Sequence, residues 1–148
     1  MSHHTAHIAW PAPSAPAAPF TYATYTRDHT VTFGTGVVID ATAAPEYRGN
    51  PTLPNPEELY VAALSGCHML TFLAIAARKG IVVTAYRDEA VGTLAKGESG
   101  ALCVTEVVLH PVVTFAAEVD TATLAALHEQ AHKGCFIANS VQTVVRVG

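Results

Sequence analysis

Residues 55–80 read NPEELYVAALSGCHMLTFLAIAARKG, and this stretch decides the fold. Asn55 can cap the first turn of a helix, Pro56 fits the first helical position, and two carboxylates follow where the helix dipole favours negative charge. Arg78 lies in the last turn, and Gly80 is typical of the position just past a helix end. These signals predict one helix of about 23 residues, roughly 35 Å long at ~1.5 Å per residue.

The predicted helix is apolar nearly all round, so we expect it to lie at the centre of the fold. Its apolar run is interrupted by Ser65, His68 and Thr71, which favours a buried helix over a membrane span. A helix of this length exceeds what a small sheet from one chain can cover. We therefore expect a second copy of the chain to cover the remainder, which predicts a homodimer.

Composition narrows the class of protein. The 148 residues are half hydrophobic, and only 14% are charged against a usual ~25%, which also favours a large interface. A formal net charge of −4 does not indicate the basic surface that nucleic-acid binding needs. No basic amphipathic stretch indicates binding to a membrane surface. The N-terminus lacks the pattern of a signal peptide, so three cysteines are expected in a reducing cytoplasm.

The rest of the chain predicts a single α+β domain over 1–148, with residues 1–19 as a proline-rich extended arm. Pro111 suggests an edge or a bulge in the strand that contains it. The expected elements are a short strand at 7–10, a hairpin or meander over 20–40, a loop over 41–54, strands over 81–94 and 101–115, a helix from Asp120 or Thr121 to Lys133, and a last strand over 141–147.

Two cysteines, Cys67 and Cys135, stand 68 residues apart in apolar, helix-like surroundings, and neither belongs to a CxxC pair. A thiol within a helix that can reach a second thiol suggests redox chemistry, although a small buried hydrophobe is the simpler interpretation of Cys67. Cys135 follows Gly134 at a helix end, where a resolving thiol would find a mobile or exposed backbone. Cys103 sits in an alternating strand and is interpreted as packing.

A reactive Cys67 lies too far from the helix start to be activated by it, so a cation must come from elsewhere. Arg27 is the best candidate, and Arg48 in the proline-rich loop is its competitor. Glu57 precedes Cys67 by ten residues, which is ~15 Å along one helix. The two can share a site only if an arginine spans the gap or if they come from different subunits.

Residues 128–132 read HEQAH and match the HExxH pattern of zinc proteases. A third ligand is missing, because no His, Asp or Glu follows His132. Only Cys135 could complete a set with His128 and His132. A metal-binding protein that uses these three residues stays open as an alternative, and histidines that pack on the helix are the preferred interpretation.

The chain resembles the OsmC/Ohr family of peroxide-reducing proteins. The resemblance rests on residues 55–59, on Cys67 ten residues after Glu57, and on the Cys135 segment, and it covers about residues 20–148. It implies an OsmC-like fold, with two strand-rich halves around a long central helix in an intertwined homodimer. The chain departs from the pattern at His68, where family members are often apolar, and at Phe136, where many have proline.

The resemblance implies a cytoplasmic, thiol-dependent peroxidase for organic hydroperoxides that needs no metal or organic cofactor. Cys67 would attack the peroxide, Cys135 would resolve the product as a disulfide, and a thiol or dithiol would reduce it again. Arg27 would hold the thiolate, and Glu57 would orient the arginine. The residues expected to line the substrate pocket are Tyr60, His68, Phe72 and Phe136.

Besides the metal-binding alternative, one further hypothesis stays open. A dimeric module with the same fold could hold a small apolar ligand without performing chemistry. Loss of free thiols on addition of an alkyl hydroperoxide would distinguish the enzyme from this module.

Overall fold

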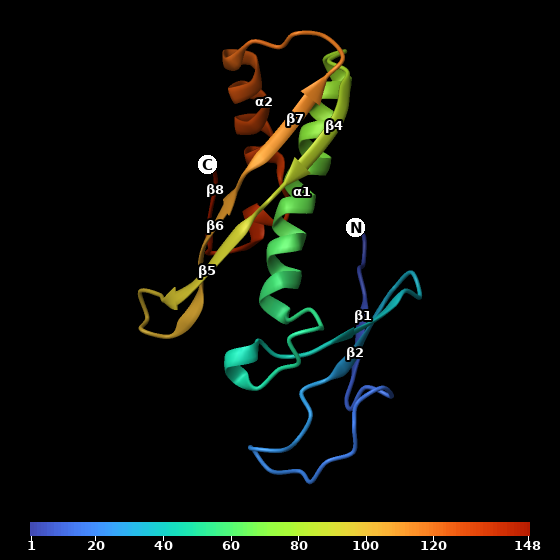
Figure 1. Cartoon of the computed structure of the whole chain (residues 1–148). Coiled ribbons are helices and arrows are strands. Elements are labelled where there is room, and N and C mark those ends of the chain that lie inside the picture. Colours follow the sequence, from blue (N-terminus) through green and yellow to red (C-terminus); the bar gives the residue numbers. More distant parts are fainter. The chain divides into compact units, whose positions relative to one another are not determined.

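The computed structural model describes residues 1–148, which form two compact units (Figure 1). The N-terminal unit is Met1–Leu59, and the C-terminal unit is Tyr60–Gly148. The chain contains both α-helices and β-sheets, which confirms the predicted α+β class. The single domain over 1–148 stays a prediction.

The N-terminal unit contains a three-stranded antiparallel sheet in the order β1-β2-β3. Val31 of the middle strand is buried and pairs with Ile8 on one side and Ile39 on the other. Gly36 has a φ of 85°, which glycine adopts readily and which closes the tight turn between β2 and β3. The strands are β1 (Ala6–Ala9), β2 (His29–Phe33) and β3 (Val38–Ala41), and a short 3-10 helix, η1 (Pro45–Tyr47), follows them.

The predicted meander over 20–40 is confirmed only from residue 29 onward. Residues 20–28 form turns instead of a strand. Thr24 donates a hydrogen bond from its hydroxyl to the Pro19 carbonyl oxygen at 2.6 Å, and its backbone N–H bonds the Thr21 carbonyl at 3.1 Å. These local bonds satisfy polar groups that a strand would have paired with its neighbour.

The long helix α1 (Pro56–Arg78) has the predicted bounds and 23 residues. Its start is a reciprocal capping box, in which the Glu58 N–H donates to the Asn55 side chain at 2.9 Å and the Asn55 N–H donates to the Glu58 carboxylate at 3.0 Å. Its end is a Schellman motif around Gly80, whose φ is 71°, with the Ile81 N–H bonding the Ala76 carbonyl at 2.9 Å. Local sequence alone therefore fixes both ends.

The C-terminal unit contains two sheets. One is an antiparallel pair of β4 and β7, and the other has the order β5-β6-β8, with β6 antiparallel to β5 and parallel to β8. The bounds are β4 (Val83–Asp88), β5 (Val91–Lys96), β6 (Leu102–Leu109), β7 (Pro111–Phe115) and β8 (Val144–Val147), and a 3-10 helix, η2 (Ala138–Ser140), precedes β8.

The two strands predicted over 81–94 and 101–115 are each broken into two, and this part of the prediction is wrong. The breaks fall between β4 and β5 and at His110. The Asp88 carboxylate accepts the His110 backbone N–H at 2.6 Å, which takes the place of a ladder bond. The sequence predicted an edge or a bulge at Pro111, and the structure has a break in the strand there. Proline has no N–H to offer a neighbouring strand.

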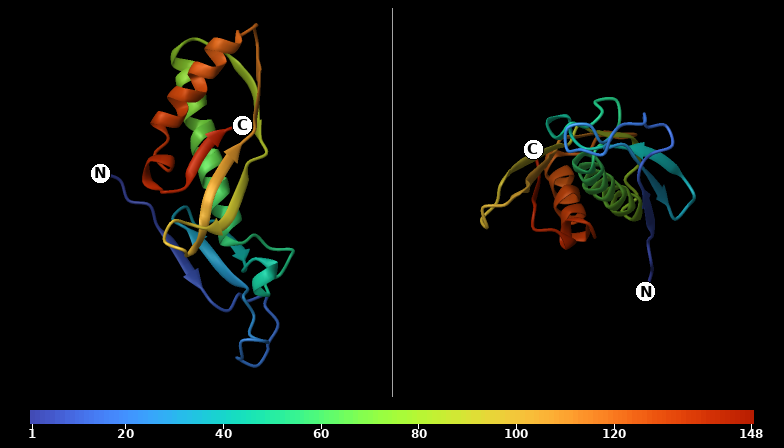
Figure 2. Two further views of the ribbon diagram at one scale, coloured as in Figure 1. Left: turned by 90° about the vertical axis from the view of Figure 1, so that its left-hand side faces the viewer. Right: turned by 90° about the horizontal axis from the view of Figure 1, so that it is seen from below.

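Helix α2 (Thr121–Gly134) is capped by Asp120, whose carboxylate accepts the Thr123 N–H at 2.8 Å. It lies beside α1, and both helices cover the same face of the strands of this unit (Figure 2). The contact is apolar, and four fully buried residues form its centre: Phe72, Ala76, Leu127 and Ala131. A second cluster lies near the start of α1 and consists of Leu64, Val107 and Leu109.

By length and composition alone, α1 could also cross a membrane. Only 22% of its most apolar stretch is buried in the single chain, and Leu70 is 64% exposed. The chain's own strands therefore leave much of this helix uncovered, as its length led us to expect. That it is a core helix covered by a second copy, and not a membrane span, stays a prediction.

Candidate active site

The structure brings Cys67 and Cys135 together in the C-terminal unit. Cys67 is half-buried on α1, and Cys135 is the residue that follows α2. Gly134 lets the end of α2 lie close to α1, because a Cβ atom at that position would lie 3.1 Å from the Thr71 methyl group on α1. Both cysteines carry free thiols. Two thiols that meet between packed helices form a pair that can exchange two electrons by closing a disulfide.

The environment of Cys135 keeps its thiol protonated. Burial raises the pKa of the Cys135 thiol, and the nearby Cys67 thiol raises it further, against the opposing effect of the Ala138 backbone N–H. That N–H lies 3.4 Å from the Cys135 sulfur. Of the two thiols, Cys67 is therefore better placed to meet a solute, since Cys135 is only 1% exposed.

This burial corrects the expectation that Cys135 would be mobile or exposed. Its carbonyl accepts the Asn139 N–H at 3.0 Å at the entry to η2, so a tight turn folds the sulfur inward. Cys103 corrects a second expectation, because it is exposed and not packed. It lies at the start of β6, with its sulfur beside Gly97.

Arg27, the predicted activating cation, lies in the N-terminal unit. Its guanidinium donates to the backbone carbonyls of Tyr25 at 2.5 Å and Tyr22 at 2.7 Å, and it stacks 3.7 Å from the centre of the Tyr25 ring. Arg48 is exposed and reaches the Ala23 carbonyl at 3.5 Å. Neither arginine forms a salt bridge within this chain.

Glu57 is half-buried in the first turn of α1, where the helix dipole favours a carboxylate. It belongs to the N-terminal unit, like Arg27, while both cysteines belong to the C-terminal unit. A common site of Arg27, Glu57 and the two thiols is therefore a proposal and not an observation.

The four predicted pocket residues differ in what they expose. Phe136 is 81% exposed beside Cys135, and the Tyr60 hydroxyl is bound to the Thr143 hydroxyl at 2.7 Å. Phe72 is fully buried between α1 and α2, and His68 is 1% exposed. Within one chain, Phe72 and His68 therefore offer no surface to a solute, and their role in a substrate pocket stays a prediction.

The metal site considered for His128, His132 and Cys135 is not formed. The structure contains no group of three His, Cys, Asp or Glu side chains arranged to hold a metal ion. His128 turns instead toward α1, where its Nδ1 lies 3.1 Å from His68 Nε2. The preferred interpretation, that these helix histidines pack, is confirmed for His128, whose ring also lies 4.6 Å from that of Phe72.

The histidine pair is held in its neutral form. Burial lowers the pKa of His68 to about 4, with nearby His128 and His132 acting in the same direction and Asp88 opposing them. Burial also lowers the pKa of His128. Asp88 is itself fixed by the Ser65 hydroxyl at 2.5 Å.

The lowered pKa of His68 predicts acid sensitivity. In the unfolded chain His68 binds a proton below about pH 6.5, whereas in the folded protein it binds one only near pH 4. The free energy of unfolding therefore falls as the pH drops through this window. We expect His68→Gln to reduce the loss between pH 7 and pH 4.5 by roughly 2 kcal/mol, measured by urea unfolding. The exposed His3→Gln should leave the loss unchanged, and an equal loss in His68→Gln would contradict the prediction.

Several residues around the thiols were missed by the sequence analysis. Gly134 was assigned only to helix closure, although it also admits Thr71, and Thr71 itself donates to the Cys67 carbonyl at 2.8 Å. The His68–His128 bond was also missed. In the sequence, each histidine precedes another ring-bearing residue by about one helical turn, His68 before Phe72 and His128 before His132. This spacing does not specify a contact between the two helices.

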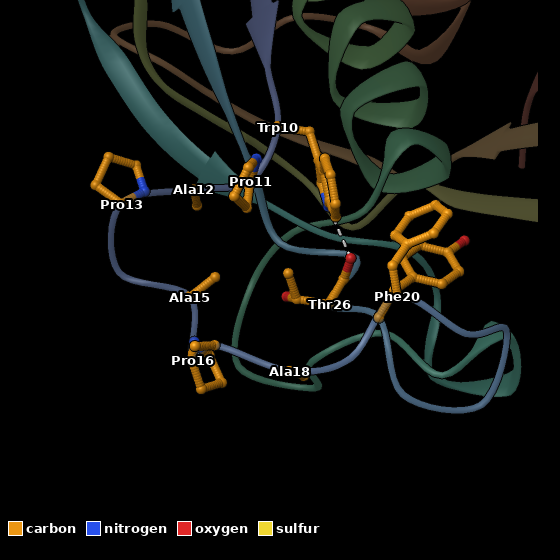
Figure 3. Close-up of a pocket in the computed structure, with 11 residues that line it drawn as sticks. Trp10, Pro11, Ala12, Pro13, Ala15, Pro16, Ala18, Phe20 and Thr26 are labelled. Carbon is orange, nitrogen blue, oxygen red and sulfur yellow. Dashed lines mark hydrogen bonds between the residues drawn. The ribbon is translucent and has the colours of Figure 1, made fainter.

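A separate pocket of about 370 Å³ lies within the N-terminal unit (Figure 3). Proline and alanine residues of the 11–18 segment form much of its wall, and Trp10, Phe20 and Tyr25 supply aromatic surface. The Trp10 indole N–H donates to the Thr26 carbonyl at 2.8 Å, and the lining is more apolar than polar. No nucleophilic or acidic side chain lines this pocket.

The fold and the thiol pair together define a dithiol α+β protein. The family described as OsmC-like protein matches residues 49–148. An OsmC-like protein of unknown function from Vibrio cholerae is 43% identical, with a TM-score of 0.91 over 100% of this chain and 99% of that one. The chain therefore belongs to the OsmC-like family.

More distant structures share the fold. An organic hydroperoxide resistance protein from Legionella pneumophila is 19% identical, with a TM-score of 0.71 over 100% of this chain and 98% of that one. The organic hydroperoxide resistance protein OhrB of Bacillus subtilis is 20% identical, with a TM-score of 0.60 over 97% and 96%. No curated protein matches this sequence.

Proposed function

We propose that this protein is a cysteine-based peroxidase that reduces organic hydroperoxides, with Cys67 as the peroxidatic and Cys135 as the resolving thiol. The observation that carries the proposal is the proximity of the two free thiols, which lie close enough that Cys67 helps to raise the pKa of the Cys135 thiol. Membership of the OsmC-like family supports a redox role, and two structures that share the fold bear names that refer to organic hydroperoxide resistance.

In the proposed reaction, the Cys67 thiolate attacks one oxygen of the peroxide bond. The bond breaks, the alkoxide leaves with a proton as an alcohol, and Cys67 becomes a sulfenic acid. The Cys135 sulfur then attacks the Cys67 sulfur, and water leaves as the disulfide forms. A thiol or dithiol reductant supplies the two electrons and two protons that restore both thiols.

In the proposed mechanism, a positive charge beside Cys67 stabilises its thiolate. We assign this role to Arg27, oriented by Glu57, because a guanidinium donates in a planar fork that suits both a thiolate and a carboxylate. The bonds of Arg27 to the Tyr22 and Tyr25 carbonyls use two of its nitrogens and leave donors free for a partner.

The proposal includes an intertwined homodimer in the cytoplasm. The uncovered apolar length of α1 supports a second copy, which would bury residues such as Leu70. Phe136, exposed beside Cys135, would then contribute apolar surface for an alkyl peroxide. The proposed reaction uses sulfur chemistry alone and assigns no step to a metal, an organic cofactor, nucleic acid or a membrane.

The test is a thiol titration of the purified protein with cumene hydroperoxide. We expect one equivalent to consume two thiols in the wild type and to give one equivalent of alcohol. In Cys135→Ser, we expect one thiol to be consumed and a sulfenic acid to form without an intramolecular disulfide, because the condensing sulfur is missing.

Mass spectrometry of the peptides and a sulfenic acid trap distinguish these products. If the wild type loses no thiol, the peroxidase proposal is wrong, and the chain behaves as a non-enzymatic ligand-binding module. If Cys135→Ser turns over at the wild-type rate with a dithiol, the resolving role of Cys135 is wrong.

A further inference from the structure

One polar link crosses the apolar contact between α1 and α2. His68 Nε2 and His128 Nδ1 lie 3.1 Å apart, and the two rings are almost parallel, with an interplanar angle of 10°. The neighbouring contacts are hydrocarbon, contributed by Phe72 and Leu127. Apolar side chains tolerate small shifts of one helix along another, whereas a buried hydrogen bond is satisfied in only one register.

This link lies close to the thiol pair along both helices. His68 follows Cys67 directly on α1, and His128 precedes Cys135 by seven residues, about two turns or ~10 Å of helix. Any shift of α2 against α1 therefore changes the separation of the two sulfurs. Disulfide formation is sensitive to such shifts, because the bond demands a narrow range of Cβ–Cβ distances.

We propose that the His68–His128 hydrogen bond is a positioning latch that fixes the register of α1 and α2 and so holds Cys67 and Cys135 at the separation that disulfide closure requires. The inference rests on the proposed cysteine chemistry and adds two positioning residues to it. Neither histidine touches the peroxide in this scheme, and both act through the cysteines.

The latch requires at least one neutral ring, since one imidazole must donate and the other must accept. His68 Nδ1 has no partner within the protein, so the bond to His128 is the only one that this buried ring makes. His132 on α2 and Asp88 and Tyr86 on β4 are the titratable groups around the pair. Protonation of both rings in acid leaves no acceptor and opens the latch.

The redox equilibrium of the cysteine pair with glutathione measures this effect directly. Two thiols of the protein reduce one glutathione disulfide to two glutathione molecules and become one intramolecular disulfide, so electrons and protons balance. The equilibrium constant reports the effective concentration of one sulfur near the other. A histidine pair that only stabilises the fold would not change this constant while the protein stays folded.

The test compares His128→Phe with the wild type at pH 7 in glutathione buffers. Phenylalanine keeps a ring against Phe72 and removes the hydrogen bond. We expect the equilibrium constant for disulfide formation to fall about tenfold, which makes the reduction potential less negative by about 30 mV. His128→Gln, which can still bond His68, should recover part of the loss.

Two controls separate the latch from general destabilisation. His132→Gln removes an exposed histidine of the same helix, and Leu124→Ala weakens the same core cluster without touching the pair. Both should keep the wild-type constant, even where Leu124→Ala lowers the melting temperature as much as His128→Phe does. The wild-type constant should also fall on acidification toward pH 4.5, and that of His128→Phe should fall less.

The outcomes distinguish the two proposals. A wild type that forms no Cys67–Cys135 disulfide overturns both the peroxidase and the latch. A wild type that forms it, with a His128→Phe constant within twofold of its own, overturns only the latch. An equal fall in Leu124→Ala also overturns the latch, because loosening of the core would then explain the change.

Discussion

Replacement of Cys67 by serine is expected to abolish hydroperoxide turnover, with a loss on the order of a thousandfold or more. A serine hydroxyl is hardly ionised near neutral pH, so it cannot replace the thiolate that attacks the peroxide bond. The variant should fold normally, because Cys67 is only half-buried and the change replaces one sulfur by an oxygen of similar size.

The measurement is consumption of cumene hydroperoxide by the pure protein in the presence of a dithiol. Cys103→Ser is the matched control, since Cys103 is an exposed thiol outside the pair and should leave the rate unchanged. If Cys67→Ser retains turnover and Cys103→Ser loses it, the reactive sulfur has been assigned to the wrong cysteine. If both variants retain it, the activity depends on neither of these two sulfurs, and Cys67 is not the peroxidatic residue.

The largest effect on stability is expected from Phe72→Ala, at about 3 to 5 kcal/mol. Phe72 is fully buried at the centre of the α1–α2 contact, and its ring lies 4.6 Å from that of His128 and 5.6 Å from that of Tyr86. Truncation removes the transfer free energy of the ring and leaves a cavity, because two packed helices relax only partly into such a space.

Urea unfolding at pH 7 measures the change as a shift of the midpoint. Phe136→Ala is the matched control, since Phe136 is 81% exposed in the single chain, and it should change the free energy of unfolding by less than about 0.5 kcal/mol. A Phe72→Ala variant as stable as Phe136→Ala would show that α1 and α2 do not share this core. A large loss in Phe136→Ala would show that a second chain buries that ring.

The bounds of the helices followed from the sequence because their signals are local. Asn55 and Glu58 are three residues apart, and Gly80 provides the left-handed turn that ends α1. The breaks at Glu89 and His110 were not predictable in this way. They depend on a bond between Asp88, the last residue of β4, and His110, which lies between β6 and β7 beyond the intervening β5–β6 pair.

The cysteine pair shows the same division. The sequence identified Cys67 and Cys135 as the candidates, because each stands in an apolar segment of helical pattern and neither has a CxxC neighbour. It could not show that α2 lies against α1 so that the sulfurs meet. It predicted an exposed Cys135, and the tertiary structure folds this sulfur inward at the entry to η2.

The sequence by itself determined the α+β class, the length and ends of the central helix, and the chemical identity of the two thiols, because caps, periodicity and residue type act over a few neighbouring residues. Only the tertiary structure decided that His68 bonds His128, that Phe72 is core, and that Cys135 is buried against Cys67. The His68–His128 and Cys67–Cys135 contacts join residues 60 and 68 positions apart, and the packing of two apolar helices selects them.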